Sequence, residues 1–367
     1  MKIAFLSKRQ YMRKDVIDDR YGRLFELPCR LAGHGHEVSA FCLSYRRRPE
    51  GVVLEEQQQA GNIRWSSNNL WPHFPAHWAK LSAALVNADV LIGASDSVHA
   101  VLTAYLARRF RKPYALDLYD NFESFGLTRI PGMRALYRAA VREAQAVFCV
   151  SQPLTDHVRS MYRTRGTVVA LESTVDSETF RPLSKEECRE KLNLPQSVSL
   201  VGTAGALDNT WRDTGCLYES IDLLRRQFPG VHLALAGPAD RRKPIPVGEH
   251  VHYLGEIPHR DVPLFFNALD VAFIGMKDGA FGKFAFPQKA YELLSCETPV
   301  VCSRNGALEG LLRDYPEHLY TAGNPVELAG KIEGLLKHPR LPALPIPDWA
   351  AQAEKMEGVL QEILREF

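Results

Sequence analysis

Residues 270–303 read DVAFIGMKDGAFGKFAFPQKAYELLSCETPVVCS. The apolar run at 271–275 predicts a buried strand, and the glycines that follow it predict a loop. We expect Pro287 to open a helix that ends near residue 295, because proline suits the first position of a helix. A second apolar run at 299–302 predicts another strand. Strand, helix and strand in this order are typical of a parallel sheet.

The same alternation of short apolar strands and helices continues outward from this stretch in both directions. It pauses at residues 173–195, which are polar and contain no predicted strand. Two such series predict an α/β protein with two Rossmann-like domains, which we expect to face each other across a cleft and to bind ligands at the carboxyl ends of their strands. The predicted strands are 2–7, 37–44, 88–95, 113–120, 146–151 and 168–172 in the first domain, and 200–205, 231–237, 250–255, 271–275, 299–302 and 318–321 in the second.

The domain boundaries follow from this pause and from the composition of the C-terminal region. We place the first domain at residues 1–175 and the second at residues 176–345. A proline-rich stretch at 339–347 precedes a last predicted helix at 348–367. We expect residues 346–367 to form a helix that crosses back to the first domain.

The composition is that of a globular protein that has more than one core. The chain has 367 residues, of which 46% are hydrophobic and 24% are charged. No stretch approaches the ~18 apolar residues of a membrane span, and the N-terminal apolar run is too short for the core of a signal peptide. The seven cysteines are scattered, without a C-x-x-C pair. We therefore expect a cytoplasmic protein with reduced thiols.

The charge is distributed unevenly along the chain. Residues 1–170 contain 24 Lys and Arg and 15 Asp and Glu, a net charge of +9, whereas residues 171–367 carry −7. Basic residues occur in a loop at 46–48, and Arg134, Arg138 and Arg142 recur on one predicted helix face, while Trp71 and Trp78 add aromatic surface. The basic N-terminal half of the chain could face an anionic membrane, or its charges could belong to an ordinary solvated surface. No motif for nucleic-acid binding is present.

The helix after Pro287 carries the residues that could bind a diphosphate. A helix N-terminus offers unpaired amides and a positive dipole end, and Lys289 adds a cation in the first turn. Glu292 lies three residues later on the same face, where a carboxylate could accept both hydroxyls of a ribose. Alternatively, Lys289 and Glu292 form an ordinary exposed pair that contributes ~0.3 kcal/mol.

The sequence FPQKAYELLSCETPVV at 286–301 resembles the donor-site signature of retaining glycosyltransferases of the GT-B fold, family four. Other segments resemble the family in the same order along the chain. The resemblance implies transfer of a sugar from a UDP- or GDP-sugar to a hydroxyl of a glycan or lipid-linked acceptor, with retention of the anomeric configuration. The other segments that resemble the family are residues 21–41, 150–182, 251–274 and 349–360.

The resemblance also implies a division of roles between the domains. The first domain would bind the acceptor, and the second would bind the nucleotide sugar. At the end of the strand predicted at 113–120, Asp120 could accept the proton of the acceptor hydroxyl, with Asp117 as a second candidate; Asp120 could instead cap a helix. The donor would be bound by Gly205, Arg212, Phe286, Pro287, Lys289 and Glu292.

Two departures from the family pattern concern the donor site. Many members carry a second Glu eight residues before the one that matches Glu292, and here that position is Phe284. Members also carry Gly-Arg followed by a Lys near the start of the second domain. In this chain Gly205 is followed by Ala206, and Arg212 could replace the missing Lys.

No cofactor or metal is expected. The retaining mechanism implied by the resemblance stabilises the leaving diphosphate with helix N-termini and basic side chains. We expect His34 and His36 to lie in a turn without partner acids, and no dense group of metal ligands occurs. Two alternatives remain open, namely a GT-B-fold sugar-nucleotide epimerase and a non-catalytic nucleotide-sugar-binding protein.

Overall fold

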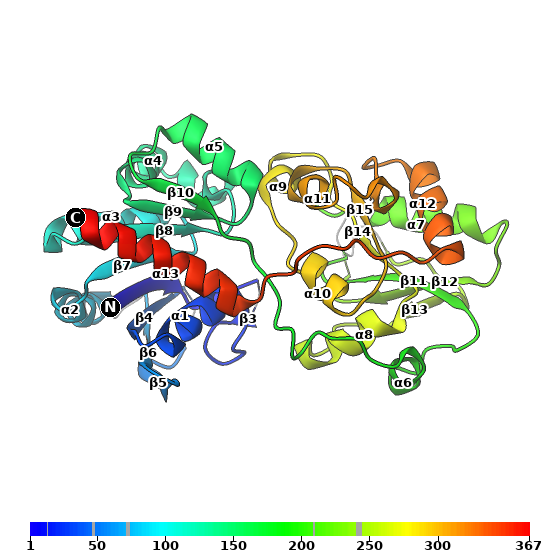
Figure 1. Ribbon diagram of the computed structural model, residues 1–367, viewed down its shortest axis with the longest axis horizontal. Coiled ribbons are helices and arrows are strands. Elements are labelled where there is room, and N and C mark those ends of the chain that lie inside the picture. The colour runs from blue at the N-terminus through cyan, green and yellow to red at the C-terminus, as the bar shows by residue number, and fades with distance from the viewer. Residues whose placement is uncertain (13, 46–47, 71–73, 208–209, 240–243) are drawn as a thin grey trace. The chain divides into compact units, whose positions relative to one another are not determined.

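The computed structural model describes residues 1–12, 14–45, 48–70, 74–207, 210–239 and 244–367. The chain forms two compact units (Figure 1). The first contains Met1–Ser173 together with Trp349–Phe367, and the second contains Thr174–Asp348. The second unit thus begins two residues before the predicted start at 176 and ends three residues after the predicted end at 345.

The first unit is built on an eight-stranded sheet with the order β10-β9-β8-β7-β1-β4-β6-β5. All neighbours pair in parallel except β5, which runs antiparallel to β6. The strands are β1 Lys2–Lys8, β4 Glu37–Ser44, β5 Gly51–Gln57, β6 Asn62–Asn69, β7 Val90–Ala94, β8 Tyr114–Leu118, β9 Ala146–Cys149 and β10 Thr167–Ala170, beside a small antiparallel pair of β2 Gln10–Tyr11 and β3 Lys14–Asp15. The helices are α1 Arg23–Gly33, α2 Phe74–Val86, α3 Ser97–Phe110, α4 Met133–Glu143 and α5 Gln152–Tyr162, with the short 3-10 turns η1 Phe122–Ser124 and η2 Gly126–Arg129.

The six strands predicted for this unit are present, but β5 and β6 were not predicted. The reason lies in β6, which buries Ile63 and Trp65 in its first half but the polar Ser66, Ser67 and Asn68 in its second. Hydrophobic periodicity detects a strand through its apolar residues, so a strand that buries polar side chains escapes it.

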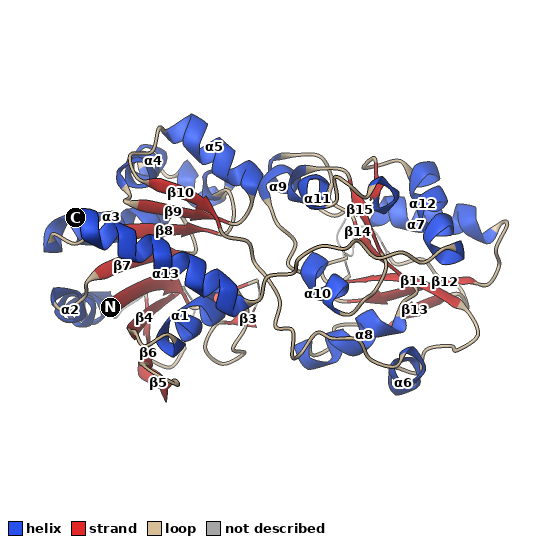
Figure 2. Ribbon diagram, in the orientation of Figure 1, coloured by secondary structure: helices blue, strands red, loops and turns tan. Residues whose placement is uncertain are grey.

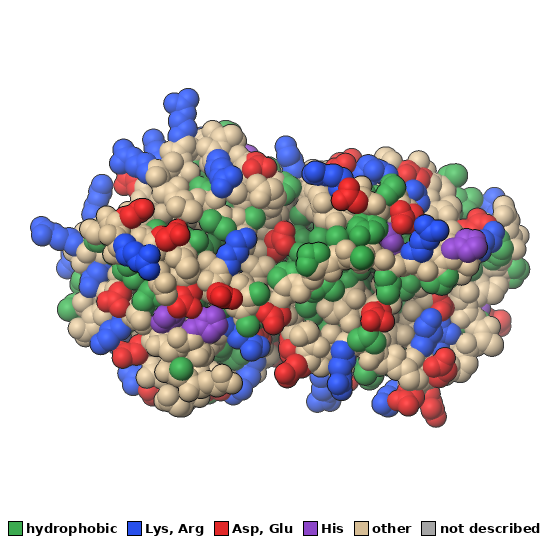
Figure 3. All heavy atoms as spheres, viewed as in Figure 1, with side chains coloured by type: hydrophobic (Ala, Val, Ile, Leu, Met, Phe, Trp, Pro, Cys, Tyr) green, Lys and Arg blue, Asp and Glu red, His purple; other side chains and the backbone are tan. Residues whose placement is uncertain are grey.

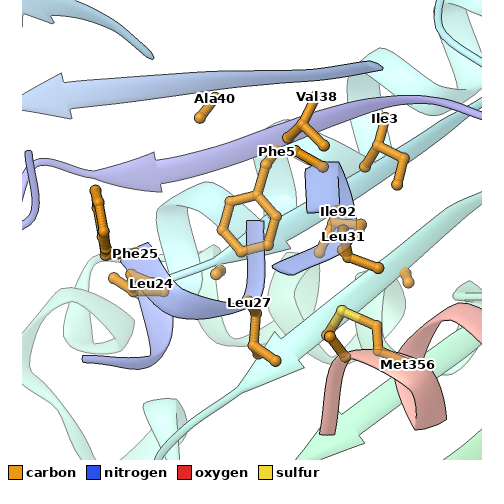
Figure 4. Close-up of a cluster of buried hydrophobic side chains, with 14 of the residues drawn as sticks. Ile3, Phe5, Leu24, Phe25, Leu27, Leu31, Val38, Ala40, Ile92 and Met356 are labelled. Atoms are coloured by element: carbon orange, nitrogen blue, oxygen red, sulfur yellow. The ribbon is translucent and has the colours of Figure 1, made fainter. Parts of the chain in front are cut away.

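The C-terminal helix α13, Trp349–Glu366, belongs to the core of the first unit. Trp349, Met356 and Leu360 are buried at helical spacing, which gives α13 one apolar face. This face packs against α1, and Met356 lies beside Leu27 of α1 in Figure 4. On its other side α1 packs against β4 and β6, and α13 itself reaches β9, so α13 completes the layer over that face of the sheet.

The second unit has a six-stranded parallel sheet with the order β13-β12-β11-β14-β15-β16. Helices lie on both faces of the sheet, as Figure 2 shows. Strand order reverses between β11 and β14, which is where doubly wound sheets bind their ligands. The strands are β11 Ser199–Ala204, β12 Val231–Ala236, β13 Val251–Tyr253, β14 Val271–Ile274, β15 Val300–Ser303 and β16 Leu319–Tyr320. The helices are α6 Lys185–Lys191, α7 Thr214–Arg225, α8 Val262–Ala268, α9 Ala280–Phe284, α10 Lys289–Ser295, α11 Gly306–Leu311 and α12 Pro325–Lys337.

All seven cysteines are free thiols. Within the described ranges, no helix combines the length and apolar character needed to cross a bilayer.

Candidate functional site

The carboxyl end of β11 is shaped by two glycines. Gly205 follows β11 with φ 115°, and Gly237 follows β12 with φ 124°, a conformation that disfavours other residues. A Cβ atom on Gly237 would lie 2.0 Å from the carbonyl oxygen of Gly205. The two strand ends therefore approach each other at backbone distance, which a side chain on Gly237 would prevent. Gly205 was predicted from the sequence as a donor residue, whereas its partner Gly237 was not.

Lys289 reaches the same strand end from α10. Its Nζ donates a hydrogen bond of 2.8 Å to the carbonyl oxygen of Ala204, the last residue of β11. A Cβ atom on Gly205 would lie 3.6 Å from this nitrogen. The structure therefore brings two of the predicted donor residues, Gly205 and Lys289, together at the point where strand order reverses.

Glu292 is buried, and this rules out the alternative that it forms an ordinary exposed pair with Lys289. Gln288 Nε2 donates a 2.9 Å hydrogen bond to Glu292 Oε1. Burial raises the pKa of the Glu292 carboxyl to about 7, and the Gln288 hydrogen bond and the Lys289 charge offset only part of this rise. Hydroxyl groups that donated to this carboxylate would favour its charged form.

The start of α10 differs from the prediction. The helix begins at Lys289 and not at Pro287, and residues 286 and 287 lie before it, outside any helix or strand. Three amides near the helix start are already paired. Those of residues 290, 291 and 292 donate to the carbonyls of Pro287 and Gln288. Phe286 is buried, and its ring lies 4.9 Å from that of Tyr291. Its side chain therefore packs in the core, whereas the contact of a diphosphate with the helix start at 286–289 stays a prediction.

Arg212 lies at a different strand end. Its Nη1 is 2.8 Å from the sulfur of Met276, and the backbones of Arg212 and Met276 form an isolated antiparallel bridge. Arg212 is thus placed beside the end of β14, whereas Lys289 lies beside β11. The next residue, Asp213, is buried and accepts hydrogen bonds from Tyr320 Oη and the amide of Gly323. Residues 208 and 209 of this loop lie outside the described part of the chain.

A polar network that was not predicted from the sequence lies at the ends of β14 and β15. Ser303 Oγ accepts a 2.9 Å hydrogen bond from the amide of Met276, and Asn305 Nδ2 donates 2.8 Å to the carbonyl of Met276. Both polar residues are buried. The signal that could have revealed them is the polar run Ser-Arg-Asn-Gly that follows an apolar strand.

In the first unit, Asp117 is fully buried inside β8, so the prediction that it could act on an acceptor is wrong. Arg23 Nε lies 2.9 Å from both carboxylate oxygens of Asp117. The guanidinium of Arg23 also donates to the carbonyl of Leu171. This ion pair joins α1, β8 and the segment after β10, and it has no access to solvent.

Asp120 lies beyond the end of β8 and is only partly buried. Burial raises the pKa of its carboxyl to about 6, while the amide of Asn121, which donates 2.7 Å to Oδ1, and the charge of Lys8 lower it. The residue before η1 is Asn121, and no side-chain hydrogen bond caps that turn, so Asp120 is not a helix cap. A partly exposed carboxylate that titrates near neutral pH suits a general base.

Ser95, at the end of β7, has φ 94°, which is unusual for a residue other than glycine. Its carbonyl accepts a 2.7 Å hydrogen bond from Tyr119 Oη, and its hydroxyl accepts 3.0 Å from the amide of Lys8. Such strained residues cluster at functional sites because the surrounding contacts hold them in place. Ser95 therefore links the carboxyl ends of β1, β7 and β8 around Asp120.

A second network adjoins Ser95. Asp96 begins α3, where its carboxylate lies 2.8 Å from His99 Nδ1 and accepts 3.0 Å from Tyr45 Oη. Although burial acts against the charge, the contacts with His99 lower the pKa of Asp96 to about 2. This group was not predicted from the sequence. The Asp three residues before a His is the signal that could have revealed it.

The described residues contain no group of three His, Cys, Asp or Glu placed to hold a metal ion. His34 and His36 do have an acidic partner, contrary to the expectation from sequence, because Glu357 of α13 lies 2.7 Å and 3.1 Å from their ring nitrogens. Two pockets of about 370 and 650 Å³ occur near Ser199 and Asp270. They lie at the amino ends of β11 and β14, opposite to the candidate donor residues.

Comparisons with known proteins cover most of the chain. The model of glycosyltransferase family 4 matches residues 23–178, and that of glycosyl transferases group 1 matches residues 199–338. A D-inositol 3-phosphate glycosyltransferase of Mycobacterium marinum is 26% identical over 179 residues, which are 44% of this chain and 36% of that protein. D-inositol 3-phosphate glycosyltransferase 2 of Catenulispora acidiphila is 25% identical over 244 residues, 62% and 55% of the two chains. The matches thus span about a third to a half of these relatives.

Solved structures are similar over the whole chain. Anabaena Alr3699/HepE in complex with UDP-glucose has a TM-score of 0.69 at 18% identity, and covers 100% of this chain and 99% of that one. Sucrose-phosphate synthase from Thermosynechococcus elongatus has a TM-score of 0.63 at 16% identity, covering 100% and 96%. At these identities the likeness establishes the fold, which is α/β with two parallel-sheet Rossmann-like domains, as in the GT-B fold. With both domains matched by its models, the chain belongs to the group 1 glycosyltransferases of family 4.

Proposed function

We propose that the protein transfers a sugar from a UDP- or GDP-sugar to a hydroxyl group of a glycan or glycolipid. The observation that carries this proposal is the pair on α10, because Lys289 lies at the end of β11 and the buried carboxyl of Glu292 lies one turn further. A nucleoside diphosphate needs a cation for its phosphates and acceptors for its ribose hydroxyls, and the two residues provide these. Family membership supports the same conclusion.

In the proposed reaction the second unit binds the donor. Lys289 contacts the diphosphate, to which the absent side chain of Gly205 gives access, and Glu292 accepts hydrogen bonds from the ribose hydroxyls. The bond between the anomeric carbon and the diphosphate oxygen breaks, and Lys289 and Arg212 stabilise the negative charge that develops. The acceptor oxygen bonds to the same face of the sugar, so that the configuration is retained. No metal takes part in this proposal.

In the proposed reaction, residues of the first unit act on the acceptor. Asp120, with a pKa of about 6, takes the proton of the attacking hydroxyl. Tyr119 and the strained Ser95 hold the strand end that carries Asp120, through the 2.7 Å hydrogen bond between them. Asp117 acts indirectly by fixing β8 through Arg23.

A thermal-shift screen with UDP, GDP, ADP and their sugars tests donor binding. A ligand at 100 times its dissociation constant adds ~2.7 kcal/mol to stability, which gives a measurable rise in melting temperature. We expect a shift with one base and its sugars, and we expect Lys289→Ala and Glu292→Gln to abolish it. Lys283→Ala is the matched control, because Lys283 is an exposed lysine in the neighbouring helix α9. Equal shifts for Lys289→Ala and Lys283→Ala would contradict the proposed phosphate contact.

One observation favours a second candidate. Phe284, which occupies the position of the missing Glu, is buried, so no acid contacts the donor sugar from there. The protein could then be a sugar-nucleotide epimerase or a non-catalytic nucleotide-sugar-binding protein. Product analysis with donor alone distinguishes these, because an epimerase converts the donor without acceptor and a binding protein leaves it unchanged.

The acceptor and the cellular site are also part of the proposal. A lipid-linked acceptor would place the protein at the inner face of the cytoplasmic membrane, where the excess of basic residues in 1–170 favours contact with anionic lipids. Part of the basic and aromatic surface predicted from the sequence, residues 46, 47 and 71, lies outside the described ranges.

A further inference from the structure

A group of large apolar side chains is exposed directly after the candidate base. Phe125 is 44% exposed, Leu127 37%, Ile130 48% and Leu136 55%. Single exposed apolar residues are normal on a protein surface, but four within twelve residues of sequence are an unusual concentration of exposed apolar side chains. We call these four residues the apolar patch.

The segment that carries the apolar patch is basic. Residues 124–142 contain no Asp or Glu and contain four arginines. Arg129 and Arg142 are exposed, and Arg134 and Arg138 lie near Glu123, whose single negative charge they share. Figure 3 shows Lys and Arg side chains gathered over the part of the first unit that contains α4 and α5. The surface therefore attracts anions.

Hydrogen bonds hold this segment in a fixed shape. The buried hydroxyl of Thr128 bonds to the carbonyls of Glu123 and Phe125, at 2.8 and 2.7 Å. The carboxylate of Glu123 accepts from Tyr162 Oη at 2.6 Å and from the guanidinium of Arg138. Because the turns are tied from inside, the apolar side chains point outward as part of the native fold.

We propose that the apolar patch and its arginines dock the protein on an anionic lipid bilayer. Apolar side chains that enter the headgroup region beside cations that contact lipid phosphates are the features of a membrane-surface site. Four partly exposed side chains bury far less than the ~800 Å² per partner of a stable protein interface, so a second protein fits the patch less well.

The patch is coupled to the candidate acceptor site by a short path. Phe122 is buried and meets Tyr119 edge to face, with ring centroids 5.1 Å apart. Asp120 lies next to Tyr119, and the patch begins at Phe125. Docking would therefore hold Asp120 close to the headgroup layer, where a lipid-linked hydroxyl lies. In this respect the inference rests on the proposed function, although binding to lipid itself does not.

The experiment measures binding of the full chain to vesicles, without donor or acceptor, so it does not depend on transferase activity. Co-sedimentation compares vesicles of phosphatidylcholine with vesicles that contain phosphatidylglycerol. The double variant Phe125→Ser/Ile130→Ser should weaken binding to phosphatidylglycerol vesicles roughly tenfold, because it removes two side chains that enter the bilayer. Val326→Ser, at a position 70% exposed in the second unit, is the matched control and should bind as the wild type does.

A charge variant tests the second half of the proposal. Arg129→Ala should weaken binding about fivefold, since one arginine near an anionic surface contributes ~1 kcal/mol, and the loss should disappear in high salt. Absence of binding to phosphatidylglycerol vesicles, or equal binding by the double variant and the wild type, would overturn the proposal. So would a dimer in sedimentation that the double variant abolishes, because the patch would then join two copies of the chain.

Discussion

At the scale of single residues, Glu292 combines burial with a pKa of about 7, and this has a consequence for stability. Between pH 4.5 and 7 the folded protein keeps a proton that the unfolded chain has released. The free energy of unfolding should therefore fall as the pH rises through this range, by roughly 3 kcal/mol in total. Glu292→Gln has no group to ionise, so this part of the pH dependence should be absent.

The measurement compares melting temperatures of the two proteins from pH 4.5 to 8. The melting temperature of Glu292→Gln should rise relative to that of the wild type as the pH rises, and the difference should level off above pH 7. Parallel curves of melting temperature against pH would show that the Glu292 carboxyl is solvated in solution. They would also weaken the proposal that Glu292 binds the ribose hydroxyls. An excess of donor should reduce the loss of stability that the wild type shows with rising pH, because the ribose hydroxyls favour the charged carboxylate.

At the scale of elements, strand β8 decides the roles of its two acids. Asp117 lies within the strand and is paired with Arg23 in the core, whereas Asp120 lies beyond the strand end. Removing one partner of a buried ion pair leaves the other charge uncompensated, at a cost of ~3–5 kcal/mol. Asp117→Asn should therefore destabilise the first unit by that amount, and Asp120→Asn should not destabilise it.

Urea unfolding of both variants, together with transferase assays, checks this separation. At neutral pH Asp120→Asn should not lower the unfolding midpoint, since burial already disfavours the Asp120 charge, and it should lose turnover about 100-fold or more, as expected for loss of a general base. If Asp117→Asn unfolded like the wild type, the buried pair would not stabilise the fold as described. Full turnover by Asp120→Asn would exclude Asp120 as the base.

The elements also show what the sequence could predict. Apolar runs identified every strand of the second sheet, because strands covered on both faces contain few polar residues. Strand β6 was missed because it buries serine and asparagine. The start of α10 was misplaced because proline can open a helix or end the extended segment before one, and only tertiary contacts decide between these.

At the scale of the whole molecule, the candidate site was predictable where it depends on local sequence. Lys289 and Glu292 share one short helix, so their spacing placed them on one face. The Arg23–Asp117 pair joins residues 94 apart in sequence, and the approach of Gly237 to Gly205 depends on how two strands end. Neither leaves a local pattern, which is why Asp117 was mistaken for a free acid.

The division of the chain makes a prediction about independent folding. The second unit is one continuous segment, Thr174–Asp348, whereas the first needs α13 from the C-terminus. Without α13 the first unit would expose the face of α1 that Trp349, Met356 and Leu360 cover, and losing each such side chain costs ~2–5 kcal/mol. Residues 174–348 expressed alone should therefore fold and bind the donor, and residues 1–173 alone should not fold cooperatively.

Addition of a peptide with the sequence 349–367 provides the decisive comparison, because it restores the missing apolar face without a covalent link. Circular dichroism should show a cooperative thermal transition for residues 1–173 with this peptide. A peptide with Met356→Ser and Leu360→Ser should not restore it, whereas Lys355→Ser, at an exposed position of the same helix, should. A cooperative transition of residues 1–173 alone would mean that α13 covers a core that is already complete, and its return to the first unit would then need another explanation than stability.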